Sequence, residues 1–331
     1  MNSPQRIASL SLDLDNQWTY LKVHGDCGWE EFPSYLDLLV PRVLNFLARR
    51  NLRITFFVVG QDAALEKNHA SLEAIAAAGH EIGNHSYSHE PWFHLYGREH
   101  VESEIVRAET CINKVTGQRP RGYRAPGFSL SPATVEVLEK RGYFYDASTF
   151  PTFIGPLARL YYLCHSGLSR SDRRERELLF GAFSEGTRPL RPYLWPNSST
   201  LVEIPVTTMP ILRTPIHLSY LLYLSRFSWK LALTYFRSAI HLCKAYSIPP
   251  SLLLHPLDFL GADDGVGLEF FPAMHLASRE KLTFLDEVIR LYCDQFDVLC
   301  VGDHAQGVLG TLHTRGIERQ PCSFTSSSSN L

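Results

Sequence analysis

The chain contains 331 residues, of which 45% are hydrophobic and 20% are charged, a composition typical of a folded globular protein. Lys and Arg total 32 against 34 for Asp and Glu, so the formal net charge is -2. This balance argues against a dedicated nucleic-acid-binding protein, because such proteins need an excess of basic side chains to bind phosphates. The length suits one large domain or two of ordinary size.

Apolar runs alternate with segments of helical spacing along the first half of the chain. The β-branched and aromatic run at 53–59 is typical of a buried parallel strand. In chain order, the pattern predicts a strand at 7–12, a helix at 41–50, a strand at 53–59, a helix at 72–78, a strand at 81–83, a helix at 101–116, a strand at 121–123, a helix at 132–141 and a strand at 143–146. This alternation predicts an α/β fold with a mainly parallel sheet, either a barrel or a doubly wound sheet.

The second half is less regular. Residues 150–200 combine aromatic residues, prolines and a charged run at 170–177, and they predict an insertion. Residues 218–245 predict one long helical region, too polar to span a bilayer but able to lie against one, although core packing is the simpler interpretation. The serine-rich end predicts a domain at 1–310 and a disordered polar tail at 311–331. The remaining predictions are strands at 201–206, 251–254 and 296–301 and a helix at 279–292.

Features that report on location are sparse. No stretch reaches the roughly 18 to 20 apolar residues of a transmembrane helix, and the first residues lack the apolar core of a secretion signal. The 7 cysteines are scattered without a CxxC pair, which favours reduced thiols over disulfides or a thiolate zinc site. We therefore expect a cytoplasmic protein, with peripheral contact to the inner face of the membrane as a second option.

Polar residues of types that bind metals or carry protons follow four predicted strands. Since the carboxyl ends of parallel strands share one edge of a sheet, these residues can converge there. Two histidines at i and i+4 converge in a helical turn, and with one carboxylate they form a metal site with an open position. Each motif alone has a simpler explanation as a cap, a turn or a core histidine. The motifs are Asp13 with Asp15, His85 with His89, Arg124 to Gly127, and His255 with Pro256.

Together and in this order, the four motifs resemble those of the NodB-type polysaccharide deacetylases, carbohydrate esterase family 4. The resemblance covers roughly residues 7–302, with a weak match at 150–200. The first motif has the Asp-x-Asp form of the branch that contains peptidoglycan deacetylases and allantoinase-like or sugar-lipid deformylase relatives. The fold it implies is an irregular (β/α) barrel of the NodB type, with the insertion near 150–200.

The resemblance also implies a metal-dependent reaction. Asp15, His85 and His89 would bind one divalent ion, and zinc is the expected metal. Asp13 would act as general base, and Arg124 would orient it through a forked ion pair.

Further roles follow from the same resemblance. His255 would be the general acid, and Asp146 its carboxylate partner, although Ala147 stands where the family's fourth motif usually carries Trp. Pro126 and Gly127 would form a turn that helps to bind the oxyanion.

The implied activity is removal of an acetyl or formyl group from the nitrogen of an amino sugar, in a glycan or a lipid-linked glycan precursor. An N-acylated sugar is therefore the expected partner, and no nucleic acid is expected. Two alternatives remain: an allantoinase-like hydrolase of a small C–N amide, and a non-catalytic glycan-binding member of the fold. A small closed pocket would favour the first, and lack of stoichiometric metal would favour the second.

Overall fold

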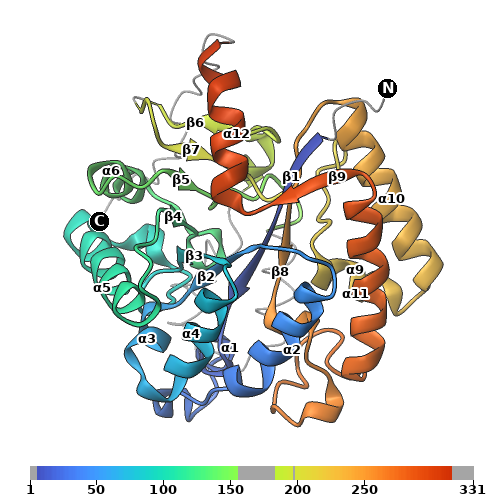
Figure 1. Ribbon diagram of the computed structural model, residues 1–331, viewed down its shortest axis with the longest axis horizontal. Helices are drawn as coiled ribbons and strands as arrows, with labels where there is room; N and C mark the ends of the chain where they lie inside the picture. Colours follow the sequence, from blue (N-terminus) through green and yellow to red (C-terminus); the bar gives the residue numbers. More distant parts are fainter. Residues whose placement is uncertain (1–5, 156–182, 197, 315–331) are drawn as a thin grey trace.

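The computed structural model describes residues 6–155, 183–196 and 198–314, with side chains as far as residue 310. The described strands form one sheet in the order β6-β7-β5-β4-β3-β2-β1-β8, and β9 also pairs with β1 (Figure 1). All pairings are parallel except that of β6 with β7. The strands are β1 (Arg6–Leu14), β2 (Thr55–Val58), β3 (Glu81–Asn84), β4 (Gly122–Tyr123), β5 (Tyr145–Asp146), β6 (Tyr193–Leu194), β7 (Val202–Glu203), β8 (Ser251–Leu254) and β9 (Phe296–Leu299).

Strand β1 is the centre of the sheet. Its first half pairs with β9, and its second half pairs with β8 on one side and β2 on the other. The strand is buried from Ala8 onward, which explains why its apolar run is nearly continuous. The sheet is curled, and its described end strands, β6 and β8, do not pair with each other, so the barrel is open. The predicted irregular (β/α) barrel is confirmed.

Helices cover the outside of the curled sheet (Figure 1). The largest apolar core joins Leu10 and Leu12 of β1 and Phe56 of β2 to helices on both sides, including Val43 of α2 and Phe236 of α10. The helices are α1 (Gln17–His24), α2 (Leu36–Ala48), α3 (Gly60–Ala64), α4 (His69–Ala77), α5 (Arg98–Thr116), α6 (Pro132–Lys140), α9 (Leu218–Ser225), α10 (Trp229–Ala245), α11 (Ser278–Cys293) and α12 (Val301–Thr314).

The helical region expected at 218–245 is present, but it consists of two helices. The segment forms α9 and α10, which are separated at Arg226–Ser228. Ser228 has an extended backbone (φ -164°), and its hydroxyl accepts a hydrogen bond from the N–H of Leu231, so it caps α10. Most apolar side chains of the two helices lie in the core, as the simpler interpretation held. Among the described residues, no helix combines the length and apolarity needed to cross a membrane.

Several boundaries also differ from the prediction; for example, the helix expected at 41–50 is α2, Leu36–Ala48. The strand expected at 296–301 ends at Leu299, and helix α12 begins at Val301 and continues to Thr314, past the expected domain end at 310. The buried His304 fixes this helix on the sheet, because its Nδ1 lies 2.8 Å from the hydroxyl of Ser9 in β1. Most of the expected insertion, including the charged run at 170–177, and residues 315–331 of the tail lie outside the described residues.

Candidate active site

The register of the sheet brings the predicted motifs to one edge. Neighbouring strands pair through one row of residues, namely Leu14, Val58, Asn84, Tyr123 and Asp146. The residue after this row is Asp15 in the first strand, His85 in the third and Arg124 in the fourth. On the other side of β1, β8 ends two residues earlier in the register, at Leu254 opposite Leu12, so His255 follows beside Asp13. Parallel pairing therefore gathers all four motifs at the carboxyl edge.

Asp15, His85 and His89 point their side-chain ligand atoms at one place. Nε2 of His89 lies 3.0 Å and Nε2 of His85 3.3 Å from the same oxygen, Oδ1 of Asp15. Nδ1 of His85 donates to the backbone carbonyl of Arg124 at 2.7 Å, which fixes the ring with Nε2 toward the carboxylate. One ligand atom from each of the three residues lies within 4.8 Å of the others.

The loop that carries the two histidines does not form the helical turn expected from their spacing. Ser86 (φ 58°) and His89 (φ 49°) both have left-handed backbone conformations. The side chain of Asn84 accepts from the N–H of Ser86, and the buried Glu104 of α5 accepts from the N–H groups of Tyr87 and Ser88. Side chains outside the loop thus hold the histidines in place.

Burial and charge at this point favour a cation. Burial alone would raise the pKa of Asp15, but the imidazoles of His89 and His85 hold it well below its usual value. Burial lowers the pKa of His89, because it outweighs the effect of the nearby Asp15 carboxylate. At His85 the charges of Asp13 and Asp15 outweigh burial, and its pKa is raised. Oδ1 of Asp15 is buried without a well-aligned hydrogen bond, although two imidazole nitrogens are near it. An oxygen so placed, with two imidazoles, fits a divalent cation.

Asp13 and Arg124 form a buried ion pair beside this cluster. Nη1 of Arg124 donates to Oδ1 of Asp13 at 2.7 Å and to the hydroxyl of Ser11 at 2.8 Å, and Nε donates to the carbonyl of Ala147. The expected two-pronged fork is therefore wrong, since only one nitrogen of the guanidinium reaches the carboxylate. The guanidinium also lies over the ring of Phe57, 4.3 Å from its centroid, which adds a favourable cation–π contact.

His255 has a partner other than the predicted one. Its Nδ1 lies 3.2 Å from the hydroxyl of Ser219 in α9, and that hydroxyl donates to Oδ1 of Asp258 at 2.8 Å. The second oxygen of Asp258 accepts from the backbone N–H of His255. The spacing of His255 and Asp258 is that of a capping box, a signal the sequence contained. No local signal identified Ser219.

Asp146 is a structural neighbour of Glu203 and is not paired with His255. The two carboxyl groups face each other across β5 and β7, and both are buried. Burial raises the pKa of Asp146 to about 6. Burial, together with the negative charge of Asp146, raises the pKa of Glu203 well above its usual value. Oε1 of Glu203 accepts from the N–H and hydroxyl of Thr149. The pair fixes the 147–149 loop, whose Ala147 carbonyl holds Arg124.

Pro126 and Gly127 form the expected turn. Gly127 has a left-handed backbone (φ 58°), and the turn begins where the N–H of Ala125 donates to the hydroxyl of Ser148. Their role in binding an oxyanion stays a prediction.

A row of rings, not anticipated from the sequence, leads from the turn at 126–128 to the His255 side of the site. The ring of Phe128 stacks on that of Phe150, and the ring of Phe150 packs edge-on against that of His217. The ring centroids of His217 and His255 lie 5.9 Å apart. Burial lowers the pKa of His217 to about 3, so this imidazole is neutral near pH 7. The row supplies a largely apolar wall beside the proton-carrying groups.

Comparison with known proteins gives a consistent picture. Residues 26–145 match the family model described as polysaccharide deacetylase. The chain is 34% identical over 131 residues to a peptidoglycan deacetylase of Helicobacter pylori, an alignment that covers 38% of this chain and 44% of that protein. The chain thus spans less than half of the length of the curated relatives that it matches.

Solved structures support the fold over nearly the whole chain. A crystal structure of a polysaccharide deacetylase homologue from Mycobacterium smegmatis superposes with a TM-score of 0.61, 19% identity and coverage of 97% of this chain and 96% of the other. An allantoinase superposes with a TM-score of 0.55, 18% identity and coverage of 94% and 95%. At these identities the likeness is one of fold.

Proposed function

We propose that this chain, whose residues 26–145 belong to the polysaccharide deacetylase family, is a metal-dependent hydrolase that removes an N-acyl group from an amino sugar. The observation that carries the proposal is the convergence of Asp15, His85 and His89 on one point beside the buried Asp13–Arg124 pair. The similarity to a peptidoglycan deacetylase supports an amino sugar as the substrate class.

The cation site sets the chemistry. Asp15, His85 and His89 would hold one divalent ion, and two imidazoles with one carboxylate suit zinc. When bound, such an ion acts as a Lewis acid, lowers the pKa of a water and polarises the acyl carbonyl. The hydrogen bond from His85 to the Arg124 carbonyl keeps its ring oriented for this task.

Asp13 is the proposed general base. It is almost fully buried next to the cation site, and its Oδ1 is fixed by Arg124. An ionised carboxylate held by a permanent cation is ready to accept a proton from the attacking water. The turn at Pro126 and Gly127 is the proposed source of a backbone N–H for the developing oxyanion.

His255 is the proposed general acid. Because Nδ1 is hydrogen-bonded to Ser219, Nε2 is the nitrogen that would protonate the departing amine. The chain of contacts from His255 through Ser219 to Asp258 orients the ring and offers a negative charge to support the imidazolium. Ser219 and Asp258 are thus positioning residues.

We also propose that the acyl group is acetyl or formyl and that the amino sugar is part of a glycan or of a lipid-linked glycan precursor. A location in the cytoplasm or at the inner face of the membrane stays a prediction.

The test uses the full chain, freed of metal by a chelator and reloaded with zinc. We expect zinc-dependent release of acetate or formate from a panel of N-acetylated and N-formylated amino sugars and their oligomers. Asp13→Asn should lower the rate about 100-fold or more while the zinc content stays unchanged, because the base is lost and the ligands remain. Asp294→Asn, an exposed carboxylate of the same kind, is the matched control.

Two results would contradict the proposal. Zinc-loaded protein that releases no acid from any member of the panel would argue for the glycan-binding alternative. Preferential hydrolysis of a cyclic ureide such as allantoin would instead favour the small-amide alternative.

A further inference from the structure

Residues 204–257 contain no Asp or Glu, although these two residues make up about a tenth of the whole chain. The same stretch has five basic residues, namely Arg213, Arg226, Lys230, Arg237 and Lys244. It includes both α9 and α10, so these two helices carry no negative side chains, whereas α11, which packs beside them, carries Glu280, Asp286 and Glu287. An excess of positive over negative charge along these two helices favours a negatively charged partner.

The exposed apolar residues of these helices gather where the helices meet. We call residues 223–231 the α9–α10 turn. Phe227 is 71% exposed, and Leu231, Tyr223 and Trp229 are 55%, 40% and 36% exposed. Arg226 and Lys230 alternate with them and are exposed as well. Aromatic and aliphatic side chains interleaved with cations are the side chains found at the surface of anionic membranes.

The turn has a fixed shape. Ser228 caps α10, and the ring of Trp229 packs edge-on against Phe284 of α11. Tyr223 packs edge-on against Phe227, and the guanidinium of Arg226 lies over the Tyr223 ring. The fold therefore holds these apolar side chains exposed to water. A surface that covers them would gain the free energy of burying them without the entropic cost of ordering the chain.

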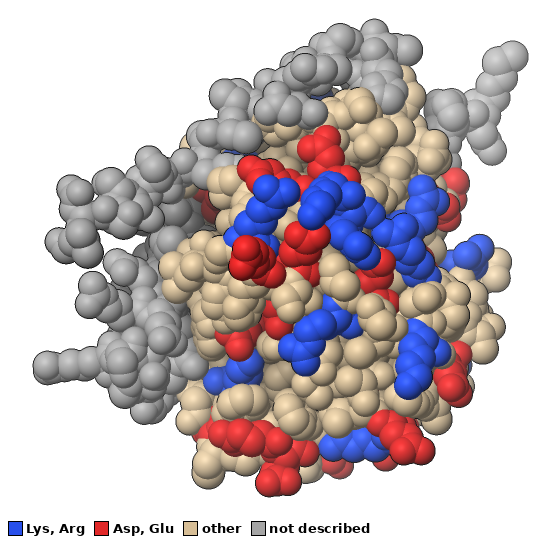
Figure 2. All heavy atoms as spheres, turned by 90° about the vertical axis from the view of Figure 1, so that its left-hand side faces the viewer, with Lys and Arg blue, Asp and Glu red and all other residues tan. Residues whose placement is uncertain are grey.

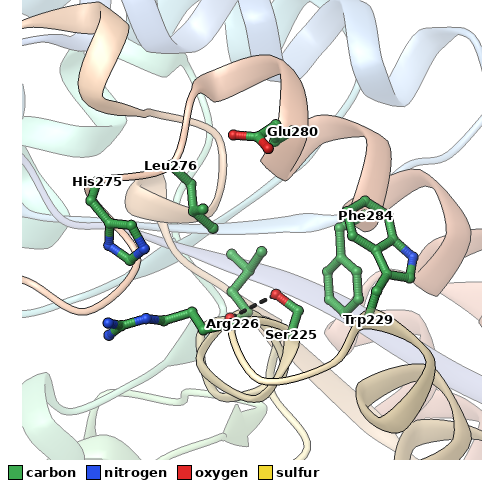
Figure 3. A pocket seen from close by; sticks show the side chains of 8 residues that line it. Ser225, Arg226, Trp229, His275, Leu276, Glu280 and Phe284 are labelled. Atoms are coloured by element: carbon green, nitrogen blue, oxygen red, sulfur yellow. Dashed lines mark hydrogen bonds between the residues drawn. The ribbon is translucent and has the colours of Figure 1, made fainter.

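A hollow of about 370 Å³ adjoins the turn. Figure 3 shows Arg226 and His275 on one side of it, and Trp229 with Phe284 on the other. The acidic side chain in the lining is Glu280, whose carboxylate accepts from the N–H of Ala277 and caps α11. The hollow thus combines a cationic side with an aromatic side.

The face that includes α5 and α6 has a different character. Figure 2 shows basic and acidic side chains interspersed on it. Ion pairs such as Lys140 with Glu102 and Arg98 with Glu136 balance its charge. This contrast within one molecule provides internal controls for the α9–α10 turn.

We propose that the α9–α10 turn docks on an anionic bilayer, with Phe227 and Leu231 entering the interface and Arg226 and Lys230 binding lipid phosphates. Helix α9 runs from this turn to Ser219, about 9 Å along a helix at roughly 1.5 Å per residue, and Ser219 bonds His255. Docking would therefore bring His255 close to the membrane surface. Resting on the proposed function, this arrangement favours an amino sugar attached to a membrane lipid as the substrate.

The experiment is flotation of the full chain with vesicles, which needs no catalytic activity. One set contains phosphatidylcholine with about a quarter phosphatidylglycerol, and the other phosphatidylcholine alone. We expect the protein to float with the anionic vesicles and to remain behind with the neutral ones. Arg226→Ala/Lys230→Ala should reduce vesicle binding tenfold or more, since each basic residue near the surface contributes about fivefold. Phe227→Ser/Leu231→Ser should also reduce it tenfold or more, because the variant loses the burial of two apolar side chains in the interface.

Matched controls come from the charge-balanced face and another exposed leucine. Arg98→Ala/Lys140→Ala and Leu38→Ser should float as the unaltered chain does. Thermal unfolding of all variants checks the fold. The Asp13→Asn variant should also float, so loss of activity and loss of docking are separable.

Three results would overturn the proposal. The chain could fail to float with anionic vesicles, or the turn variants could float as the controls do. Alternatively, the turn variants could convert a dimer to a monomer in solution while no vesicle binds, which would make this turn a contact between two copies.

Discussion

Nη1 of Arg124 lies 2.7 Å from Oδ1 of Asp13 and 2.8 Å from the hydroxyl of Ser11, so one nitrogen of a fully buried guanidinium binds two side chains of β1. Nε of the same residue is held by the carbonyl of Ala147, and the backbone carbonyl of Arg124 holds His85. One arginine thus links the proposed base, a proposed metal ligand and the 147–149 loop. Its position follows from the pairing of β4 between β3 and β5.

Replacing Arg124 by lysine should impair catalysis much more than substrate binding. A single ammonium group cannot reach Asp13 and the Ala147 carbonyl at the same time, so the carboxylate loses its fixed orientation. We expect Arg124→Lys to lower kcat about 100-fold with little change in KM, measured by release of the acyl group. Arg121→Lys, at an exposed position three residues earlier, is the control and should keep its activity. Equal losses in both variants would show that Arg124 has no special role.

Removing a ligand histidine should abolish stoichiometric metal binding. His89→Gln takes one of three ligand atoms from a site in which each atom is buried, and the two remaining ligands should bind the ion far more weakly. We expect about one zinc per unaltered chain and well below that for His89→Gln, measured by elemental analysis after dialysis. His94→Gln is the matched control, since His94 contacts Ser129 outside the cluster. A full metal content in His89→Gln would exclude the site.

The hydroxyl of Ser219 should matter to proton transfer rather than to binding. Without it, Nδ1 of His255 loses its partner and the link to Asp258. We expect Ser219→Ala to lower kcat roughly tenfold, with a changed acid–base profile, and Ser219→Thr to restore most of the rate. Ser225→Ala, near the other end of α9, removes a hydroxyl that donates to the Leu222 carbonyl and, among the described residues, does not contact His255 or Asp258; it should have no effect. A pH profile that is unchanged in Ser219→Ala would refute this role.

Acid should destabilise the fold partly through His304. Burial lowers the pKa of His304 to about 4, against 6.5 for an ordinary histidine. Between these values the unfolded chain binds the extra proton and the folded chain does not, so stability falls as the pH drops from about 6.5 to about 4. The contribution is about 3 kcal/mol for a shift of this size.

Denaturant unfolding at several pH values tests this contribution. His304→Gln should lose less of its free energy of unfolding over that pH range than the unaltered chain does. His241→Gln, at an exposed position of α10, should lose as much as the unaltered chain. Parallel pH curves for all three proteins would contradict the prediction, whatever their absolute stabilities.

Several features of the fold and site could be predicted because they depend on neighbours in the chain. The alternation of apolar strands and helical segments predicted the parallel sheet, and Asp15, His85 and Arg124 each directly follow a strand. Parallel strands bring such positions to one edge whatever the length of the connections between them. The cluster was therefore accessible from local pattern together with the family resemblance.

Other predictions failed where a non-local contact decides. Asp146 looked like the partner of His255, but strand pairing sets it opposite Glu203, and the neighbour of His255 is Ser219 on a helix without any motif. The helix break at Ser228 and the start of α12 at Val301 depend on capping and on packing against β1. The sequence of residues 218–245 did not show which apolar side chains are buried. Packing buries most of them and leaves exposed the turn that we propose docks on a membrane.

The sequence alone determined which residues carry chemistry and the edge of the sheet at which they lie, because strand periodicity and strand ends are local properties of the chain. The tertiary structure alone decided which of those residues touch one another. Hydrogen bonds and ion pairs in a folded protein join atoms that lie far apart in the chain, and their geometry is set by register and packing, which no single segment contains.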